Sequence, residues 1–141
     1  MTGACIAASL RRLVEERAHG CCEYCWTPAQ VSLTPHEVDH IVAQKHGGLT
    51  QADNLALSCS LCNKHKGTDL TTLEPGTGEI VALYHPRRDH WADHFRLNGA
   101  EIEPLTPIGR ATVRLLQLNR PERITERDIL ISAGLLRIPT G

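Results

Sequence analysis

Two C-x-x-C pairs are the first residues in this chain whose types and spacing imply chemistry. They are Cys22-Glu-Tyr-Cys25 and Cys59-Ser-Leu-Cys62. Two thiolates at this spacing can chelate one ion, and two such pairs complete a tetrahedral four-thiolate site with no open position, which is typical of structural zinc. An accidental cluster or a redox-active C-x-x-C is the alternative, and the presence of two pairs favours zinc.

The two remaining cysteines are interpreted differently. Cys21 would give a wider spacing to Cys25, so Cys22 is the predicted ligand and Cys21 its neighbour. Cys5 stands alone and is predicted to be a packing residue. Aromatic residues make up only 4% of the chain, and metal binding would add folding free energy that a core poor in large side chains lacks.

A second set of residues that could carry out chemistry lies between the two C-x-x-C pairs. Positions 26–58, which are 33 residues, exceed the usual gap between zinc knuckles and contain Asp39, His40 and Asn54. Histidine is a common general base near neutral pH, and a carboxylate holds a hard divalent cation through oxygen. Adjacent residues of a strand point to opposite faces. Asp39 and His40 can therefore serve one reaction centre only where the strand ends or bends, and the Gly-Gly pair at 47–48 permits that.

Asparagine and lysine residues complete this group. Asn63 follows Cys62 directly and offers an amide oxygen to the same ion. Asn54 can orient the base or hold the loop backbone, although an asparagine here can also simply turn the chain. Lys64 and Lys66 can meet phosphates, or they can form a solvated helix face, which is the commoner fate of paired charges. Each of these residues alone could have an ordinary structural or surface role, but their occurrence together favours a catalytic site.

Three parts of the chain must position these residues: an N-terminal helical part at 1–20, a core at 21–72 and a C-terminal extension at 73–141 that packs on the core. The first part is predicted to hold one amphipathic helix, with Ser9 as its cap and Gly20 as its end.

The predicted core consists of a strand, a loop and a short helix. The alternation over 36–43 predicts the strand, and the turn residues over 46–54 predict the loop. The helix is predicted over about 60–70, with Ser58 or Ser60 near its start.

The C-terminal extension combines a strand over 79–84 with two helices. Pro107 suits the first turn of one helix, and Pro121 is predicted to stop a helix ahead of a capped final helix from about 125. Arginines are frequent here and can bind phosphates: Arg87, Arg88, Arg96, Arg110, Arg114, Arg120, Arg123 and Arg127. The alternative is that nearby acids neutralise them on an ordinary charged surface: Glu101, Glu103, Glu122, Glu126 and Asp128.

Aromatic and histidine residues of the extension favour structural roles. Trp91 and Phe95, four residues apart, are predicted to be core residues rather than base-stacking platforms. His85, His90 and His94 lie near arginines and are predicted to be surface residues rather than a second metal site.

Composition narrows the classes of protein. The formal net charge is -1, which counts against a protein that coats nucleic acid non-specifically but allows a local basic face. The apolar run in the N-terminal segment is too short for a signal peptide, and no apolar run in the chain reaches the length of a membrane helix. A cytoplasmic, reducing setting without a membrane is therefore expected, where paired cysteines bind metal before they form disulfides.

The stretch from Cys22 to about Gly67 resembles the HNH endonuclease family. The matching elements are CEYC, EVDHIV, GG, NLALSCSLCN and KHKG. The version with two C-x-x-C pairs is similar to that of phage junction-resolving nucleases and many restriction enzymes. The segment from 85 to 120 looks like the region that follows the core in a group of small stand-alone bacterial HNH proteins.

The resemblance implies an α+β fold with a ββα-metal (HNH/His-Me finger) nuclease core. In such a core a two-stranded hairpin and the following helix hold one catalytic ion, beside the structural four-cysteine zinc site. By resemblance, His40 activates water, Asp39 and Asn63 ligate Mg2+ or Mn2+, and Asn54 orients the base. His65 is the alternative ligand, because some members carry a second histidine near the position of Asn63.

Two functions follow from these observations. The first is metal-dependent hydrolysis of phosphodiester bonds, with DNA as the expected substrate and 5′-phosphate and 3′-hydroxyl ends. The second is a zinc-built nucleic-acid-binding module without catalysis. A redox protein is a weaker third option, and the sequence leaves a monomer and a homodimer open.

Overall fold

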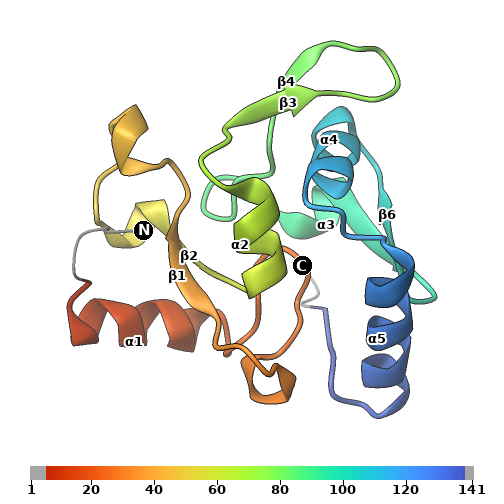
Figure 1. Ribbon diagram of the computed structural model, residues 1–141, viewed down its shortest axis with the longest axis horizontal. Coiled ribbons are helices and arrows are strands. Elements are labelled where there is room, and N and C mark those ends of the chain that lie inside the picture. The colour runs from red at the N-terminus through yellow and green to blue at the C-terminus, as the bar shows by residue number, and fades with distance from the viewer. Residues whose placement is uncertain (1–5, 139–141) are drawn as a thin grey trace.

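The N-terminal helix packs one apolar face on the strands that follow. A computed structural model describes residues 6–138 (Figure 1), so the prediction for Cys5 lies outside the described residues. Helix α1 spans Ala8–Arg17. Its apolar face carries Leu10 and the fully buried Val14, four residues apart, and this face packs on the apolar residues of the following hairpin.

The two ends of α1 differ in how well the sequence predicted them. Ala7 is the N-cap residue and makes no side-chain hydrogen bond, so the prediction that Ser9 caps the helix is wrong. Ser9 lies inside the first turn, where its hydroxyl cannot take the capping position. The predicted stop at Gly20 lies just past the observed end: α1 ends at Arg17 with Ala18 as its C-cap. The chain then turns through His19 and Gly20, whose φ angles are +52° and +70°, and the Gly20 N–H donates to the carbonyl oxygen of Glu15 at 3.0 Å.

A hairpin and one helix form the centre of the molecule. Strand β1 (Glu37–His40) pairs antiparallel with β2 (Leu55–Ser58), and helix α2 (Ser60–Lys66) follows at once. Cys59 is the N-cap of α2, and its sulfur accepts a hydrogen bond from the N–H of Cys62 at 3.4 Å. A predicted metal ligand thus starts the helix, in the position between the two serines that the sequence had favoured.

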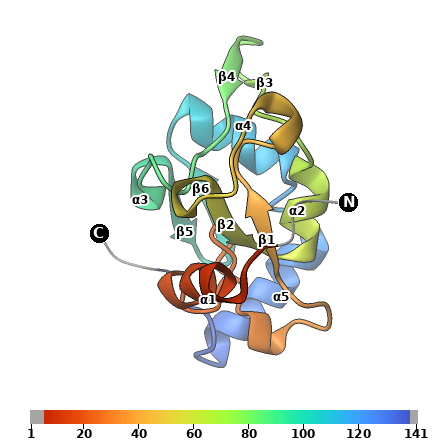
Figure 2. The same ribbon diagram turned by 90° about the vertical axis from the view of Figure 1, so that its left-hand side faces the viewer.

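The β1–β2 hairpin lies between α1 and α2. Val38 pairs across the strands with Leu57, and this side packs on α1. Asp39 lies on the opposite side of β1 and contacts α2. Figure 2 shows the hairpin with α1 below it and α2 beside it. The period-2 pattern of β1 therefore determines which side chains face which helix.

Short 3-10 turns replace the single loop that the sequence predicted between the strands. Residues Gln44–His46 form η2 and Ala52–Asn54 form η3, after an earlier turn η1 at Ala29–Val31. The chain between β1 and β2 is thus a folded excursion rather than a free loop. Its backbone N–H and C=O groups therefore need local hydrogen-bond partners.

The segment after α2 adds two hairpins and three helices within the described residues. They are β3 (Thr71–Leu73), β4 (Ile80–Ala82), α3 (Trp91–His94), β5 (Phe95–Asn98), β6 (Glu101–Pro104), α4 (Pro107–Leu115) and α5 (Pro121–Ser132). Pro107 occupies the first turn of α4, as predicted. The prediction that Pro121 precedes the last helix is wrong, because Pro121 starts α5, where its fixed φ and missing N–H cost nothing.

The main core joins the cysteine pairs to the C-terminal segment. All four paired cysteines are buried there among aromatic and aliphatic side chains. Trp91 and Phe95 are buried with ring centroids 5.1 Å apart, which confirms their prediction as core residues. The indole N–H of Trp91 donates to the carbonyl oxygen of Tyr24 at 2.9 Å, which ties the C-terminal segment to the first cysteine pair.

Candidate active site

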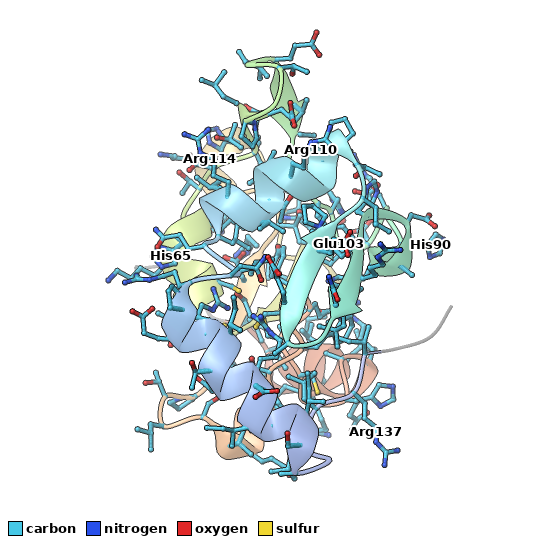
Figure 3. All side chains as sticks on the ribbon, turned by 90° about the vertical axis from the view of Figure 1, so that its right-hand side faces the viewer. His65, His90, Glu103, Arg110, Arg114 and Arg137 are labelled. Carbon is cyan, nitrogen blue, oxygen red and sulfur yellow. The ribbon has the colours of Figure 1, made fainter. Side chains whose placement is uncertain are left out.

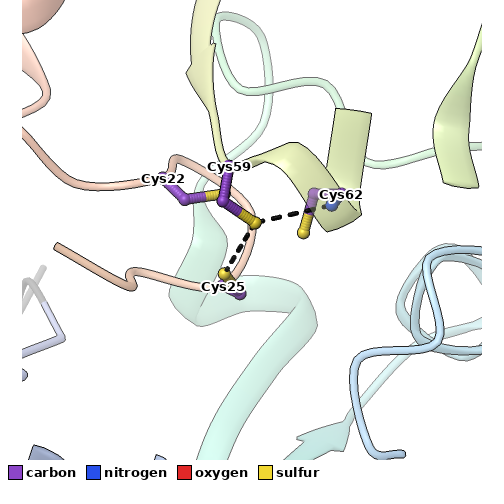
Figure 4. A group of neighbouring side chains, drawn as sticks. All are labelled: Cys22, Cys25, Cys59 and Cys62. Atoms are coloured by element: carbon purple, nitrogen blue, oxygen red, sulfur yellow. Dashed lines mark hydrogen bonds between the residues drawn. The ribbon is translucent and has the colours of Figure 1, made fainter. Parts of the chain in front are cut away.

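The four paired cysteines gather in one buried cluster. Their sulfur atoms all lie within 4.8 Å of one another, although the two pairs come from distant parts of the sequence (Figure 4). The Sγ atoms of Cys25 and Cys59 are 3.7 Å apart. Four sulfurs at about 2.3 Å from one zinc ion lie roughly 3.8 Å from one another. The donor type, number and spacing therefore fit a tetrahedral zinc ion, and the cluster could hold one.

The electrostatics of the cluster favour ionised sulfur in part. Hydrogen bonds from Cys22 and the other cysteines lower the pKa of the Cys25 thiol well below its usual value, while burial raises the pKa of Cys22. Arg123 of α5 donates from Nη2 to Cys62 Sγ at 3.2 Å. Burial acts against the charge of Arg123, but the nearby cysteine sulfurs outweigh it and raise the pKa of this guanidinium.

The first cysteine pair is fixed to the hairpin by one buried glutamate. The N–H of Glu23 donates to the carbonyl oxygen of Leu57 at 2.8 Å, and the Glu23 carboxylate accepts from the N–H of Leu57 at 2.8 Å. Arg87 pairs with the other oxygen of this carboxylate. The cysteine cluster thereby has a set position relative to β2, and hence to the polar residues on β1.

Two polar contacts join β1 to α2. The Asn63 amide nitrogen donates to the Glu37 carboxylate, and the Lys66 ammonium lies 3.4 Å from Asp39 Oδ2. Glu37 and Asp39 share one face of β1, and Asn63 and Lys66 are one turn apart on α2. Burial raises the pKa of Asp39, and Lys66 opposes that shift.

Lys66 does not lie where a phosphate contact needs it. It is 2% exposed, and its ammonium also donates to the carbonyl oxygen of Ile41 at 3.0 Å. The expectation of a solvent-facing Lys66 is therefore wrong, because the carboxylate of Asp39 and a backbone carbonyl draw this cation inward. Lys64 is exposed on α2, so its predicted phosphate contact stays a prediction.

His40 ends β1 and is held by a threonine hydroxyl. Its Nε2 atom lies 2.9 Å from Thr50 Oγ1, and the residue is buried. The strand ends at this residue, as the sequence argument required for Asp39 and His40 to serve one centre. Thr50 was not singled out from the sequence, because nothing in its neighbours marks a threonine ten residues away as the partner of a histidine.

Asn54 holds the excursion that carries Thr50. Its Oδ1 accepts from the N–H of Val42 at 2.9 Å, and its Nδ2 donates to the carbonyl oxygens of Val42 at 3.0 Å and Leu49 at 2.9 Å. The amide thus joins the two ends of the segment. Of the roles that the sequence left open, this geometry matches the one in which Asn54 holds the loop backbone.

Gly48 permits this close approach of the backbone. A Cβ atom at this position would lie 1.7 Å from the carbonyl oxygen of Val42 and 2.8 Å from Asn54 Nδ2. No side chain fits there without displacing the segment. The second glycine of the predicted Gly-Gly pair is therefore required by space rather than by φ.

An open cavity of about 990 Å³ brings the polar residues together. Nine charged or polar residues line it: Arg11, His36, Glu37, Asp39, His40, Gln44, Lys45, Asn63 and Thr68. Asn54 is not among its lining residues. Glu37 was not predicted as a site residue, although its place two residues before Asp39 on a strand puts both carboxylates on one face.

Two exposed cations at the cavity belong neither to α2 nor to the C-terminal extension, the two regions in which phosphate contacts were predicted. Arg11 belongs to α1, and Lys45 belongs to η2. Neither forms an ion pair among the described residues. The sequence carried no signal that α1 would place Arg11 beside β1, because that contact depends on tertiary packing.

Acidic side chains form ion pairs with several arginines of the C-terminal extension. Arg96 pairs with Glu103 at 3.0 Å, and Arg120 lies 3.4 Å from Glu122, as the alternative interpretation expected. Arg110 pairs with Glu74, a carboxylate that the sequence had not assigned to it. Figure 3 shows Arg110 and Arg114 one turn apart on α4. Arg123 and Arg127 are buried and therefore unable to contact phosphates.

The histidines of the extension form no metal-binding group. Within residues 6–138, the four cysteines are the one group of three or more histidine, cysteine or acidic side chains placed to share an ion. His85 accepts backbone N–H groups through Nδ1, and His94 bonds the hydroxyl of Thr106 at 2.6 Å. His65, the alternative catalytic ligand, contacts Gln117 and does not line the cavity.

Comparison with known families bears on this region. The family model of the HNH endonuclease matches residues 22–69, which are 48 of the 141 positions and include every paired cysteine, β1, β2 and α2. No curated protein and no solved structure matches the chain. None of the described helices has the length and apolar character that crossing a membrane requires. The match to this family confirms the resemblance seen in the sequence and indicates a nuclease-type or nucleic-acid-binding function for the matched stretch.

Proposed function

We propose that this protein is a metal-dependent endonuclease that hydrolyses phosphodiester bonds of DNA. The observation that supports this most is one open cavity lined by His40, Asp39 and Asn63, three residues that all lie inside the stretch matched by the HNH endonuclease family. A base and two oxygen donors beside one space can activate water and hold a cation against the same phosphate. The β1–β2–α2 unit is the proposed ββα-metal core.

His40 is the proposed general base. If Nε2–H donates to Thr50, the ring is held in one orientation and Nδ1 stays free to take a proton from water. Asn54 acts indirectly, because it holds in place the segment that carries Thr50. The hydroxide so formed attacks phosphorus, the P–O3′ bond breaks, and the leaving O3′ takes a proton from solvent, so that the products carry a 5′-phosphate and a 3′-hydroxyl.

Asp39 and Asn63 are the proposed ligands of a catalytic Mg2+ or Mn2+. Their donor chemistry fits, because both offer oxygen and both line the cavity. Since Asn63 donates from Nδ2 to Glu37, its Oδ1 is the atom left for a cation. A bound divalent cation would neutralise charge that develops on the phosphate. Lys66 supplies positive charge to the Asp39 carboxylate from within the protein.

Arg11 and Lys45 are the proposed phosphate contacts beside this centre. Both are exposed at the cavity, and such cations hold the backbone of a nucleic acid without reading its sequence. The four cysteines are proposed to bind zinc, with a structural role. DNA rather than RNA, and a cytoplasmic location, remain parts of the proposal that rest on the resemblance and on cysteine use.

A plasmid-nicking assay with purified, zinc-containing protein in Mg2+ or Mn2+ tests the proposal. Cleavage should require the added cation, stop in EDTA and be lost in His40→Ala, whereas His46→Ala should cut normally. His46 is an exposed histidine on η2 that does not line the cavity, which makes it a matched control. Cys25→Ser should lose zinc and unfold the core.

The alternative function predicts a different outcome from the same samples. If zinc-loaded protein binds DNA but cuts no plasmid, single-stranded, branched or RNA substrate, it is a nucleic-acid-binding module without catalysis. Cleavage that persists in His40→Ala would refute the assignment of the base.

A further inference from the structure

Helix α5 turns two arginines into the protein interior. Arg123 is 7% exposed and Arg127 is 3% exposed, and their spacing of four places them on one face of α5. A buried guanidinium is costly unless its N–H groups and its charge are matched. Across residues 6–138, no carboxylate forms an ion pair with either arginine.

The two arginines find different partners. Arg127 donates to two backbone carbonyls, those of Ala100 at 2.7 Å and Leu118 at 2.8 Å. Arg123 donates from Nη1 to the carbonyl oxygen of Leu116 at 2.9 Å. Its Nη2 points at sulfur instead, 3.2 Å from Cys62 Sγ and 3.9 Å from Cys59 Sγ.

A zinc ion bound by four thiolates would carry two net negative charges in a buried place. The ion contributes two positive charges and the sulfurs four negative ones, so the cluster needs a cation nearby. Arg123 is the cation that touches the sulfurs. Its N–H···S bonds also reach both members of the second pair, which begins α2.

We propose that Arg123 is the charge-compensating residue of the zinc site, and that through it zinc binding and the docking of α5 stabilise each other. This inference rests on the proposed zinc occupancy and is independent of nuclease activity. Because coupling between two binding events is reciprocal, a residue that strengthens zinc binding by contact from α5 must also make α5 dock more firmly when zinc is present. This coupling gives the C-terminal extension a function in zinc binding that the sequence did not reveal.

Zinc release from three variants tests this proposal. Arg123→Met removes the charge and the N–H···S bonds, and Arg127→Met is the matched control, since it removes a buried arginine of the same helix that bonds only carbonyls. Release to excess chelator should be about 10–100-fold faster in Arg123→Met, as expected when an outer contact to a metal ligand is lost. Arg127→Met should release zinc at most a few-fold faster. Arg123→Lys, which keeps the charge, should recover part of the loss.

Cobalt substitution gives a readout that helix loosening alone would not move. Hydrogen bonds and positive charge at thiolate sulfur lower the energy of its lone pairs, so the sulfur-to-cobalt charge-transfer band should shift to longer wavelength in Arg123→Met. The band should stay in place in Arg127→Met. If Arg123→Met does not fold, a smaller shift in the same direction in Arg123→Lys serves as the test.

Two negative outcomes are distinguishable. If wild-type protein holds no zinc or cobalt, the proposed zinc site is wrong and this inference falls with it. If wild-type protein holds the metal, but Arg123 and Arg127 variants share one release rate and one band position, the role of Arg123 is refuted while the zinc site stands.

Discussion

Replacing Asn54 by alanine should destabilise the protein and impair its proposed activity together. The amide makes three hydrogen bonds, two to Val42 and one to Leu49. A net value of about 1 kcal/mol per hydrogen bond gives a loss of about 3 kcal/mol. The bond to Leu49 is exposed, so water can replace it in part, which brings the expected loss to about 2–3 kcal/mol.

Urea unfolding of Asn54→Ala measures this loss, with Asp53→Ala as the matched control. Asp53 lies in the same 3-10 turn but is exposed, so its removal should change the free energy of unfolding by less than about 0.5 kcal/mol. Asn54→Asp keeps the acceptor for the Val42 N–H but sets a carboxylate against two carbonyl oxygens. Its loss should be at least as large as that of the alanine variant.

Plasmid nicking by the same variants separates two roles of Asn54. If the segment that carries Thr50 loosens, His40 loses its fixed orientation, and a misplacement of about 1 Å can cost about 100-fold in rate. Stability and nicking should therefore fall together in Asn54→Ala. An unchanged free energy of unfolding with lost nicking would refute the loop-holding role and indicate that the amide acts on the reacting groups.

Three further predictions concern the loop, the β3–β4 hairpin and the basic residues. Gly48→Ala should destabilise at least as much as Asn54→Ala in the same urea assay, because a Cβ would overlap the carbonyl oxygen of Val42, and a stable variant would refute the close approach. The hydrogen bond from Arg110 lowers the pKa of the fully buried Glu74 to about 2 from 4.5. Its ionised form therefore stabilises the fold above about pH 4.5, and this contribution is lost as the pH falls towards 2. Glu74→Gln should unfold at lower urea than wild type at pH 7, with a gap that narrows at pH 3, and a gap independent of pH would contradict this. In EDTA, Arg11→Gln should reduce the slope of log K against log salt for duplex DNA by about 0.9, and exposed Arg12→Gln, which lies outside the cavity lining, should not; equal slopes would remove Arg11 from the interface.

The sequence predicted the centre of the molecule better than its periphery. The two cysteine pairs, the strand before the Gly-Gly pair and the helix after Cys59 all carry signals within a few residues. The hairpin of β5 and β6 was missed even though Asn98-Gly99 is a common hairpin turn and Gly99 has φ of +63°. This hairpin therefore carries a local sequence signal of its own.

Other features could not be predicted from local patterns. Lys66 is a charged residue on a short helix, and only the tertiary contact with Asp39 and Ile41 explains its burial. Arg123 likewise looked like one of many arginines, because its sulfur partners lie about sixty positions away in the sequence. Periodicity describes which side of an element is apolar, but it does not say which distant group will meet a buried charge.

The two cysteine pairs lie on either side of residues 26–58, so a break in this stretch divides the chain between them. Leu33 is fully exposed between them, so a protease cut near it would leave one C-x-x-C on each fragment. With zinc bound as proposed, the ion would then be the joint between two separate polypeptides, helped by the packing of α1 on β2. The nicked protein should run as two bands under denaturing conditions and as one particle in size-exclusion chromatography, until a chelator separates the halves. The fold would thus tolerate a broken backbone at this point as long as its metal remained.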